Sequence, residues 1–275
     1  MKAAHREFLA DLRAGVVLAR PEAVDAALQG LRRLPEVAGN QPLSEGFELQ
    51  VLLPAGEMLG RASLPGSYLV DLSRDPLAAV RASAGAAMLR RTVNGETFFD
   101  SALQTLAGAR RADVRQVLAR AGEAQAGAFP DQLLGLALSW LAAAAAAQTA
   151  SEVRDRLQST ALLLICPLAG RRALALLAII RALPAELGPE ANAALAALLA
   201  ALAESGSADE VLELLKEWAV ASPPPEWLIG RALSGGWVLE HRAQAEAILA
   251  LLESRTGPTR HISNARRALD RRVEG

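Results

Sequence analysis

The chain has 275 residues and a formal net charge of −1, and two residue types dominate it, with 59 Ala and 48 Leu. Both favour helices, whereas the β-branched and aromatic residues that favour strands are scarce. A chain this apolar and this close to neutral is not disordered, and its single cysteine, Cys166, excludes a disulfide-stapled scaffold. The composition therefore predicts an all-α protein.

The longest apolar stretches do not predict a membrane span. Residues 133–147 fall short of the roughly 20 apolar residues that a span needs. Residues 161–180 are interrupted by Pro167 and by the pair Arg171 and Arg172. The N-terminal segment carries charges throughout, unlike a secretory signal, and the sequence pI of 6.4 argues against a general nucleic-acid binder. We therefore expect a cytoplasmic protein.

Helix-start signals recur at regular intervals along the chain. Proline is favoured at the first position of a helix, with Ser, Thr, Asp or Gly just before it. That pattern occurs at Asp75-Pro76, Gly188-Pro189, Ser222-Pro223 and Gly257-Pro258. Thr149 with Glu152 forms a capping-box pattern, and residues 111–113 precede another apolar stretch. Helices are thus expected to start near residues 75, 111, 149, 188, 222 and 257, at intervals of 34–39 residues.

A second set of helices is expected between those starts, over residues 96–108, 130–147, 170–184, 207–220 and 237–254, with a last helix over 258–272. Ser207 with Glu210 forms another capping-box pattern there. Each unit is then a helix pair of about 37 residues, which cannot bury its own apolar face alone. The spacing therefore predicts an all-α, right-handed α-solenoid of about six to seven antiparallel helix pairs over residues 74–275.

Three of these helices resemble HEAT and armadillo-like repeats. Each carries a Val-Arg pair early in the helix, preceded by an acidic residue, at Val80-Arg81, Val114-Arg115 and Val153-Arg154. The likeness covers residues 75 to about 160, and from residue 188 onward only the helix spacing continues it. Tetratricopeptide repeats are the competing family, but the run of their Trp, Gly, Tyr and Pro signature positions is missing. The resemblance implies that the shared arginine bonds within or between repeats.

The first 73 residues fit the repeat pattern less well and are expected to form an irregular N-terminal cap. Helices are plausible over residues 3–19 and 21–33, with Pro21 at a helix start. Residues 35–65 are rich in Gly and Pro, and Phe47, Leu49 and Val51 alternate with polar residues. That alternation is compatible with a short strand that ends in a turn at Pro54. An irregular helix pair broken at Pro54 is the alternative.

The residues that could carry chemistry form no recognisable catalytic or metal-binding motif. His5, His241 and His261 are far apart in sequence, and none lies at ligand spacing from Cys166 or another histidine. Cys166 lies in an apolar context that favours a buried small hydrophobe. GxxxxGK, GxSxG and HExxH motifs are missing. We expect no catalytic residue, no cofactor and no metal, and hence no enzymatic activity.

Eight residues are candidates for contacting a partner: Arg115, Arg120, Arg154, Trp218, Trp227, Trp237, Arg266 and Arg267. Tryptophan is enriched at interface hot spots and stacks on bases, although packing between neighbouring helices also explains this cluster. The last sixteen residues are locally basic, which would suit an acidic partner or a phosphate. A solvated terminal helix is the alternative there, as a solvated helix face is for Arg120.

Two functions follow from these features. A solenoid with no identifiable catalytic set favours a non-enzymatic interaction scaffold or adaptor, which binds a protein partner through its surface. The alternative is a DNA-binding or DNA-repair protein, because the chain also resembles HEAT-like alkylpurine DNA glycosylases in helix layout. Such enzymes need a basic groove, exposed aromatics and a catalytic acidic residue, and the net charge of −1 argues against that groove. A bilin-lyase-like HEAT protein is a third option, to which no residue points.

Overall fold

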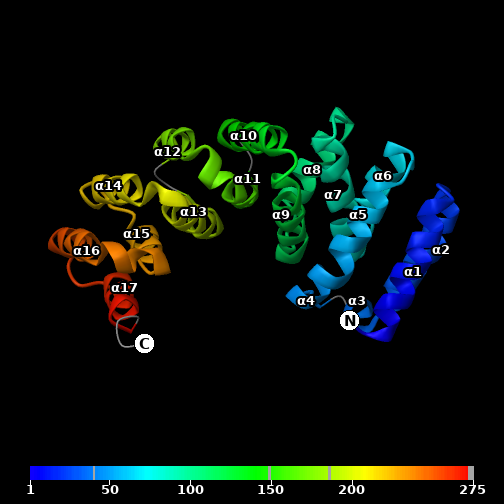
Figure 1. Cartoon of the computed structure of the whole chain (residues 1–275), viewed down its shortest axis with the longest axis horizontal. Coiled ribbons are helices and arrows are strands. Elements are labelled where there is room, and N and C mark those ends of the chain that lie inside the picture. The colour runs from blue at the N-terminus through cyan, green and yellow to red at the C-terminus, as the bar shows by residue number, and fades with distance from the viewer. Residues whose placement is uncertain (40, 148–149, 185–186, 272–275) are drawn as a thin grey trace. The chain divides into compact units, whose positions relative to one another are not determined.

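The computed structural model describes residues 1–39, 41–147, 150–184 and 187–271, and every regular element within these ranges is a helix (Figure 1). The prediction of an all-α protein is thereby confirmed. Contacts between residues divide the chain into two compact units, Met1–Thr160 and Ala161–Gly275. The boundary expected from the sequence, between residues 73 and 74, separates a cap from repeats and stays a prediction.

The first unit is built around α7, which packs against α5 on one side and α9 on the other. These three helices form one row, while α8 contacts α7 and α9, and α10 contacts α9. The helices of this unit are α1 (Ala3–Val17), α2 (Pro21–Arg33), α3 (Pro35–Ala38), α4 (Glu45–Phe47), η1 (Glu48–Leu52), α5 (Leu53–Arg61), α6 (Gly66–Leu72), α7 (Ala78–Val93), η2 (Thr97–Phe99), α8 (Asp100–Ala107), α9 (Ala112–Ala126), α10 (Pro130–Ala146) and most of α11 (Ser151–Ile165).

Small residues let α5 and α7 approach each other closely. A Cβ added at Gly56 of α5 would lie 2.5 Å from the Cβ of Ala86 and 2.9 Å from the carbonyl oxygen of Ser83, both on α7. Both distances are too short for carbon atoms to occupy, so the bare backbone of Gly56 sets the separation of the helices. The high alanine content thus has a packing role, since most of α7 is buried.

The second unit contains two rows, each formed by contacts between alternate helices. In one row α13 contacts α15 and α15 contacts α17, and in the other α14 contacts α16. The elements are η3 (Cys166–Arg171), α12 (Ala173–Arg181), α13 (Pro189–Leu202), η4 (Ala203–Ser207), α14 (Ala208–Ala219), α15 (Glu226–Ala232), η5 (Gly236–His241), α16 (Arg242–Thr256) and α17 (Arg260–Arg271).

One helical stretch among the described residues, Pro189–Ala219, is long and apolar enough to pass a test for a membrane span. It consists of α13, η4 and α14, and Gly206 within it has a φ of +99°, which interrupts the helix. Half of its most apolar window is buried inside the protein. Packing inside the protein therefore accounts for half of that window.

The helix starts agree with the sequence prediction to within four residues. The helices in question begin at Ala78, Ala112, Ser151, Pro189, Glu226 and Arg260. Of the four proline patterns predicted to start helices, Gly188-Pro189 alone places its proline at the first helical position. At Asp75-Pro76 the carboxylate of Asp75 accepts a hydrogen bond from the backbone N–H of Leu77, so a turn precedes the helix. Ser207 makes no capping hydrogen bond, contrary to its pattern, and Thr149 lies outside the described residues.

The strand considered for residues 47–51 is wrong. Residues 45–61 are helical throughout, as α4, η1 and α5. Phe47 and Val51 are both buried, four residues apart, while Leu49 between them is 45% exposed, which is a helical pattern of burial. The break expected at Pro54 is also wrong, because the helix passes through it. Proline lacks an N–H and its ring clashes with the carbonyl four residues earlier, and the wider π-helical turn η1 accommodates it.

Candidate functional site

The shared arginine of the repeat-like helices has a structural role in two of the three cases. The guanidinium of Arg81 donates to the carbonyl oxygens of Asp75 and Pro76, at 2.6 and 2.8 Å. Arg115 donates to the equivalent carbonyls of Ala109 and Arg110, at 2.5 and 3.2 Å. Each arginine thus ties the start of its helix to the preceding turn, which agrees with the role that the resemblance implies.

The third shared arginine, Arg154, and the candidate Arg120 also belong to the first unit. Arg154 is half-buried on α11, and the carbonyls that would correspond to those bound by Arg115 belong to residues 148 and 149, which lie outside the described residues. Arg120 forms an ion pair with Glu45 at 2.7 Å, and its Nε lies 3.6 Å from a carboxylate oxygen of Glu48. Arg120 therefore ties α9 to the helix at residues 45–52.

Glu48 is the most unusual carboxylate of the first unit. Its side chain is 1% exposed, and both carboxylate oxygens are buried without a hydrogen-bond partner. Burial raises the pKa of this carboxyl above its ordinary value, and the nearby carboxylates of Asp113 and Glu45 add to the rise, against the lowering effect of Arg120. Asp113 has a lowered pKa despite its burial, because it accepts hydrogen bonds from Arg111 and from backbone N–H groups.

The candidate residues of the second unit are not gathered at one place. Trp227 is 36% exposed on α15, and Trp218 is half-buried near the end of α14. Trp237 lies in η5, and its ring centre is 6.5 Å from that of His241. Arg266 pairs with Glu253 at 2.6 Å, and Arg267 bonds to Asn264 on its own helix, so α17 has the character of a solvated terminal helix.

A groove in the first unit runs across the row of alternate helices. This α7 groove has a volume of about 480 Å³ and is lined by residues of η1, α5, α7 and α9 and by Ala128 and Phe129. Leu49, Leu53, Ala86, Ala121 and Ala124 contribute to its apolar surface. An open groove with such walls suits the side chains of a protein partner.

The charged groups in the α7 groove are bonded to one another. A carboxylate oxygen of Glu57 lies 2.6 Å from a guanidinium nitrogen of Arg61 and 2.7 Å from one of Arg90. Arg90 also donates to the side-chain oxygen of Gln125 at 3.4 Å. The network therefore links α5, α7 and α9, and Glu57 is paired with two guanidinium groups.

Two adjoining cavities lie on the second unit, and Asp209 lines both of them. The α14–α16 groove, of about 360 Å³, is lined only by side chains of these two helices, among them Leu212, Ile248 and Leu251. The Trp237 cavity, of about 510 Å³, lies between η4 and η5 and is lined by Trp237, Leu239, His241 and three carboxylates, Glu204, Asp209 and Glu240.

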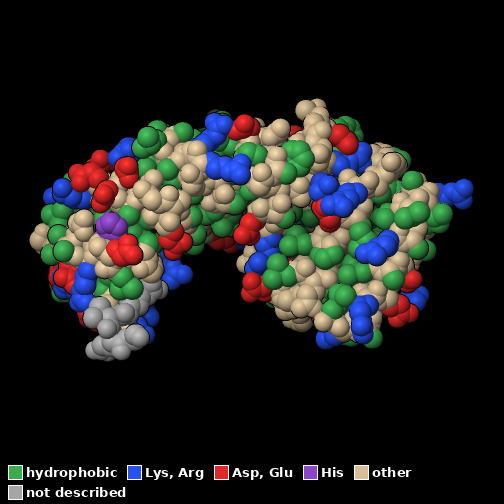
Figure 2. Space-filling model, viewed as in Figure 1, with side chains coloured by type: hydrophobic (Ala, Val, Ile, Leu, Met, Phe, Trp, Pro, Cys, Tyr) green, Lys and Arg blue, Asp and Glu red, His purple; other side chains and the backbone are tan. Residues whose placement is uncertain are grey.

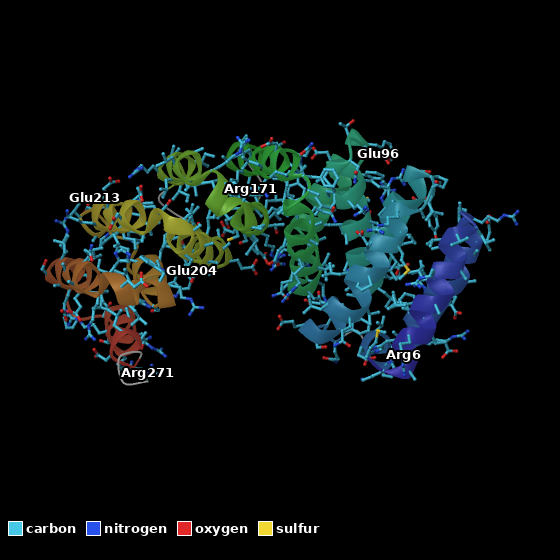
Figure 3. The ribbon with its side chains drawn as sticks, in the orientation of Figure 1. Arg6, Glu96, Arg171, Glu204, Glu213 and Arg271 are labelled. Atoms are coloured by element: carbon cyan, nitrogen blue, oxygen red, sulfur yellow. The ribbon has the colours of Figure 1, made fainter. Side chains whose placement is uncertain are left out.

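Acidic side chains surround these two cavities. Figure 2 shows Asp and Glu side chains gathered over α14, next to a histidine. Glu213 on α14 and Glu204 in η4 are labelled in Figure 3. His241 lies 3.8 Å from Asp209 through its Nδ1. Among the described residues, no three His, Cys, Asp or Glu side chains are close enough together to hold a metal ion.

The sequence pointed to Trp237 but missed the residues around it and the whole α7 groove. A signal for the groove existed in the sequence. Glu57, Arg90 and Gln125 follow one another at intervals of 33 and 35 residues, close to the 34–39 residues that separate the helix-start signals. Comparison with known proteins found no matching family model, no similar curated protein and no similar solved structure.

Proposed function

We propose that the chain is a non-enzymatic interaction scaffold built from HEAT-like helix pairs, and that the α7 groove receives a protein partner. One observation carries the proposal. Three successive helices of one row, α5, α7 and α9, leave an open and largely apolar groove, at which Leu49 remains 45% exposed. Apolar surface of this kind is stabilised when a partner removes it from water.

Spacing and contacts support the repeated architecture. Alternate helices touch each other within each unit, which is the arrangement that a row of stacked helix pairs requires. Polar contacts join residues about one repeat apart, with separations of 33 residues for Glu57 and Arg90 and 36 residues for Arg181 and Glu217. Such contacts link corresponding positions of neighbouring helix pairs.

The chemistry of the groove suits binding better than catalysis or DNA recognition. Glu57, the carboxylate of the groove, is engaged in ion pairs with Arg61 and Arg90. A DNA-binding surface needs guanidinium groups that face phosphates, whereas Arg120 and Arg266 are engaged with carboxylates of this chain. A protein partner with apolar side chains matches the lining of the groove.

A photo-cross-linking experiment tests this function. The exposed Ala124 in the groove is replaced by p-benzoyl-phenylalanine, and the same substitution at the exposed Ala10 of α1, outside the groove, is the control. Both variants are expressed and irradiated in the source cells, and the adducts are identified by mass spectrometry. We expect one discrete protein adduct from position 124 that is missing from position 10.

A third variant separates specific binding from chance encounters. Leu49→Glu places a charge at an exposed apolar position that lines the groove, and it should abolish the adduct at position 124 without unfolding the protein. Equal adduct patterns from positions 124 and 10, or an adduct that persists with Leu49→Glu, would overturn the proposal. Circular dichroism of each variant verifies the helical fold.

A further inference from the structure

We propose that the second unit binds a basic amphipathic helix of a protein partner, with its apolar stripe in the α14–α16 groove and an Arg or Lys side chain in the Trp237 cavity. The two cavities adjoin at Asp209, so one ligand can occupy both. This site is separate from the α7 groove, and the proposal does not depend on a partner binding there.

The walls of the α14–α16 groove have the spacing of two helix faces laid side by side. On α14 they are residues 209, 212, 213 and 216, and on α16 they are residues 244, 247, 248 and 251. Both sets follow the i, i+3, i+4, i+7 pattern of a single helix face. Two helices in contact leave a furrow between them, and a third helix fits such a furrow through its own apolar stripe.

The charges determine which kind of helix fits. Glu204, Asp209, Glu213 and Glu240 line the two cavities. Lys216, the lining side chain with a permanent positive charge, pairs with Glu213 at 3.5 Å, which leaves the lining with an excess of negative charge. The carboxylates are too dispersed for a metal ion, and several separate cationic side chains on one helix would match them better. The same charge repels phosphates, which disfavours a nucleic acid or an anionic membrane at this surface.

Trp237 supplies the aromatic part of the proposed subsite. The edge of its indole ring lies against Gly235, where an added Cβ would be 2.6 Å from both Cδ1 and Nε1. The backbone of Gly235 thus holds the ring in place at the wall of the cavity. An aromatic ring beside carboxylates is a favourable environment for a guanidinium or ammonium group, which the ring attracts through its π-electrons.

Fluorescence anisotropy with a labelled synthetic helix tests the proposal. The probe is a peptide of about 18 residues with Leu at i, i+3, i+4 and i+7 and Arg at the remaining polar positions. A second peptide carries Glu in place of every Arg. We expect the full chain to bind the Arg peptide with a micromolar Kd at low salt, and to show no binding of the Glu peptide.

Variants of the protein locate the binding site. Glu204→Gln with Glu240→Gln should weaken binding about five-fold, because two exposed charge pairs are lost. Ala247→Arg, at an exposed position in the groove, should abolish binding by blocking the furrow and repelling the peptide. Glu7→Gln with Asp11→Asn makes the same change in net charge on the exposed face of α1 and is the matched control.

Three results would overturn the proposal. The first is the absence of binding at protein concentrations of about 100 µM. The second is equal binding of the Arg and Glu peptides. The third is a loss of affinity in the α1 control as large as that in the cavity variant, which would show nonspecific attraction.

Trp237→Leu keeps an apolar side chain in the cavity and should weaken binding of the Arg peptide more than that of a Lys peptide.

Discussion

Replacing Glu48 with methionine should stabilise the protein at neutral pH. The carboxylate is 1% exposed, its two oxygens lack hydrogen-bond partners, and the nearest cationic atom, Nε of Arg120, is 3.6 Å away. A buried polar group without partners costs about 1–3 kcal/mol, and replacing a buried charge by an apolar group of similar volume is often stabilising. Arg120 keeps its ion pair with Glu45 at 2.7 Å, so the substitution leaves no unpaired guanidinium.

We therefore expect Glu48→Met to increase the free energy of unfolding by about 1–3 kcal/mol at pH 7. The measurement is urea-induced unfolding followed by circular dichroism, which reports the loss of helix in both units. Glu45→Gln is the control, because Glu45 is largely exposed and its ion pair with Arg120 is worth about 1 kcal/mol at most. It should shift the transition slightly, towards lower stability.

The stability gained by Glu48→Met should increase with pH. Because the folded-state pKa of Glu48 is raised above the ordinary value of 4.5, the folded protein binds the proton more tightly than the unfolded chain. Ionised Glu48 lowers the free energy of unfolding. This loss is smallest below pH 4.5, grows as the pH rises from 4.5 through the raised pKa, and is constant above it. Glu48→Met should show a larger gain in stability at pH 7 than at pH 4.

Two results would refute this reasoning. A variant that is destabilised by more than about 1 kcal/mol at pH 7 would mean that the carboxylate makes an interaction the fold requires. An advantage of the same size at pH 4 and pH 7 would mean that ionisation of Glu48 is not the source of the cost. Glu48→Gln, which resembles the protonated acid, should lie between the wild type and the methionine variant at pH 7.

Three more predictions address packing, helix capping and ionisation. Gly56→Ala should lower the free energy of unfolding by about 1–3 kcal/mol, because the added Cβ would overlap α7. Gly46→Ala, with open space around it, is the control and should change the free energy of unfolding by less than about 1 kcal/mol. Thermal unfolding of the two variants measures the difference. Arg115→Met should cost about 2–3 kcal/mol in urea unfolding, since two charge-assisted hydrogen bonds are lost. Tyr68, the single tyrosine, has a strongly raised pKa from burial and from its hydrogen bond to Asp25, so ultraviolet titration of the folded protein should show no tyrosinate at pH 11.

Helix positions were predictable because they depend on local signals. Proline and capping residues mark helix starts within a few residues, and the apolar stripe confirms each helix independently. The strand considered around Phe47 was wrong because the segment fits two patterns. Five alternating residues match a strand, while Phe47 and Val51, four residues apart, match one face of a helix equally well. Burial decides between these templates, and burial depends on what packs against the segment, here α5 and α9.

The cavities were not predictable in the same way, since their residues come from different helices. Trp237 could be singled out by residue type, but nothing local in the sequence joins it to Glu204 or Asp209, about thirty residues earlier. The regular spacing of the helix starts is the feature of the sequence that could have predicted contacts between different helices. If residues about one helix-start interval apart are assumed to be neighbours, the sequence alone predicts the contact between Glu57 and Arg90, which are 33 residues apart.

The same spacing explains how a chain so rich in Ala and Leu can adopt one arrangement. Apolar helix faces built from two residue types resemble one another, so packing alone distinguishes poorly between correct and shifted neighbours. Polar contacts join Glu57 to Arg90 in the first unit, 33 residues apart, and Arg181 to Glu217 in the second, 36 residues apart. They are satisfied only when the helices pack in one register. These few charges therefore contribute more to the specificity of stacking than to its free energy, which the apolar surface supplies.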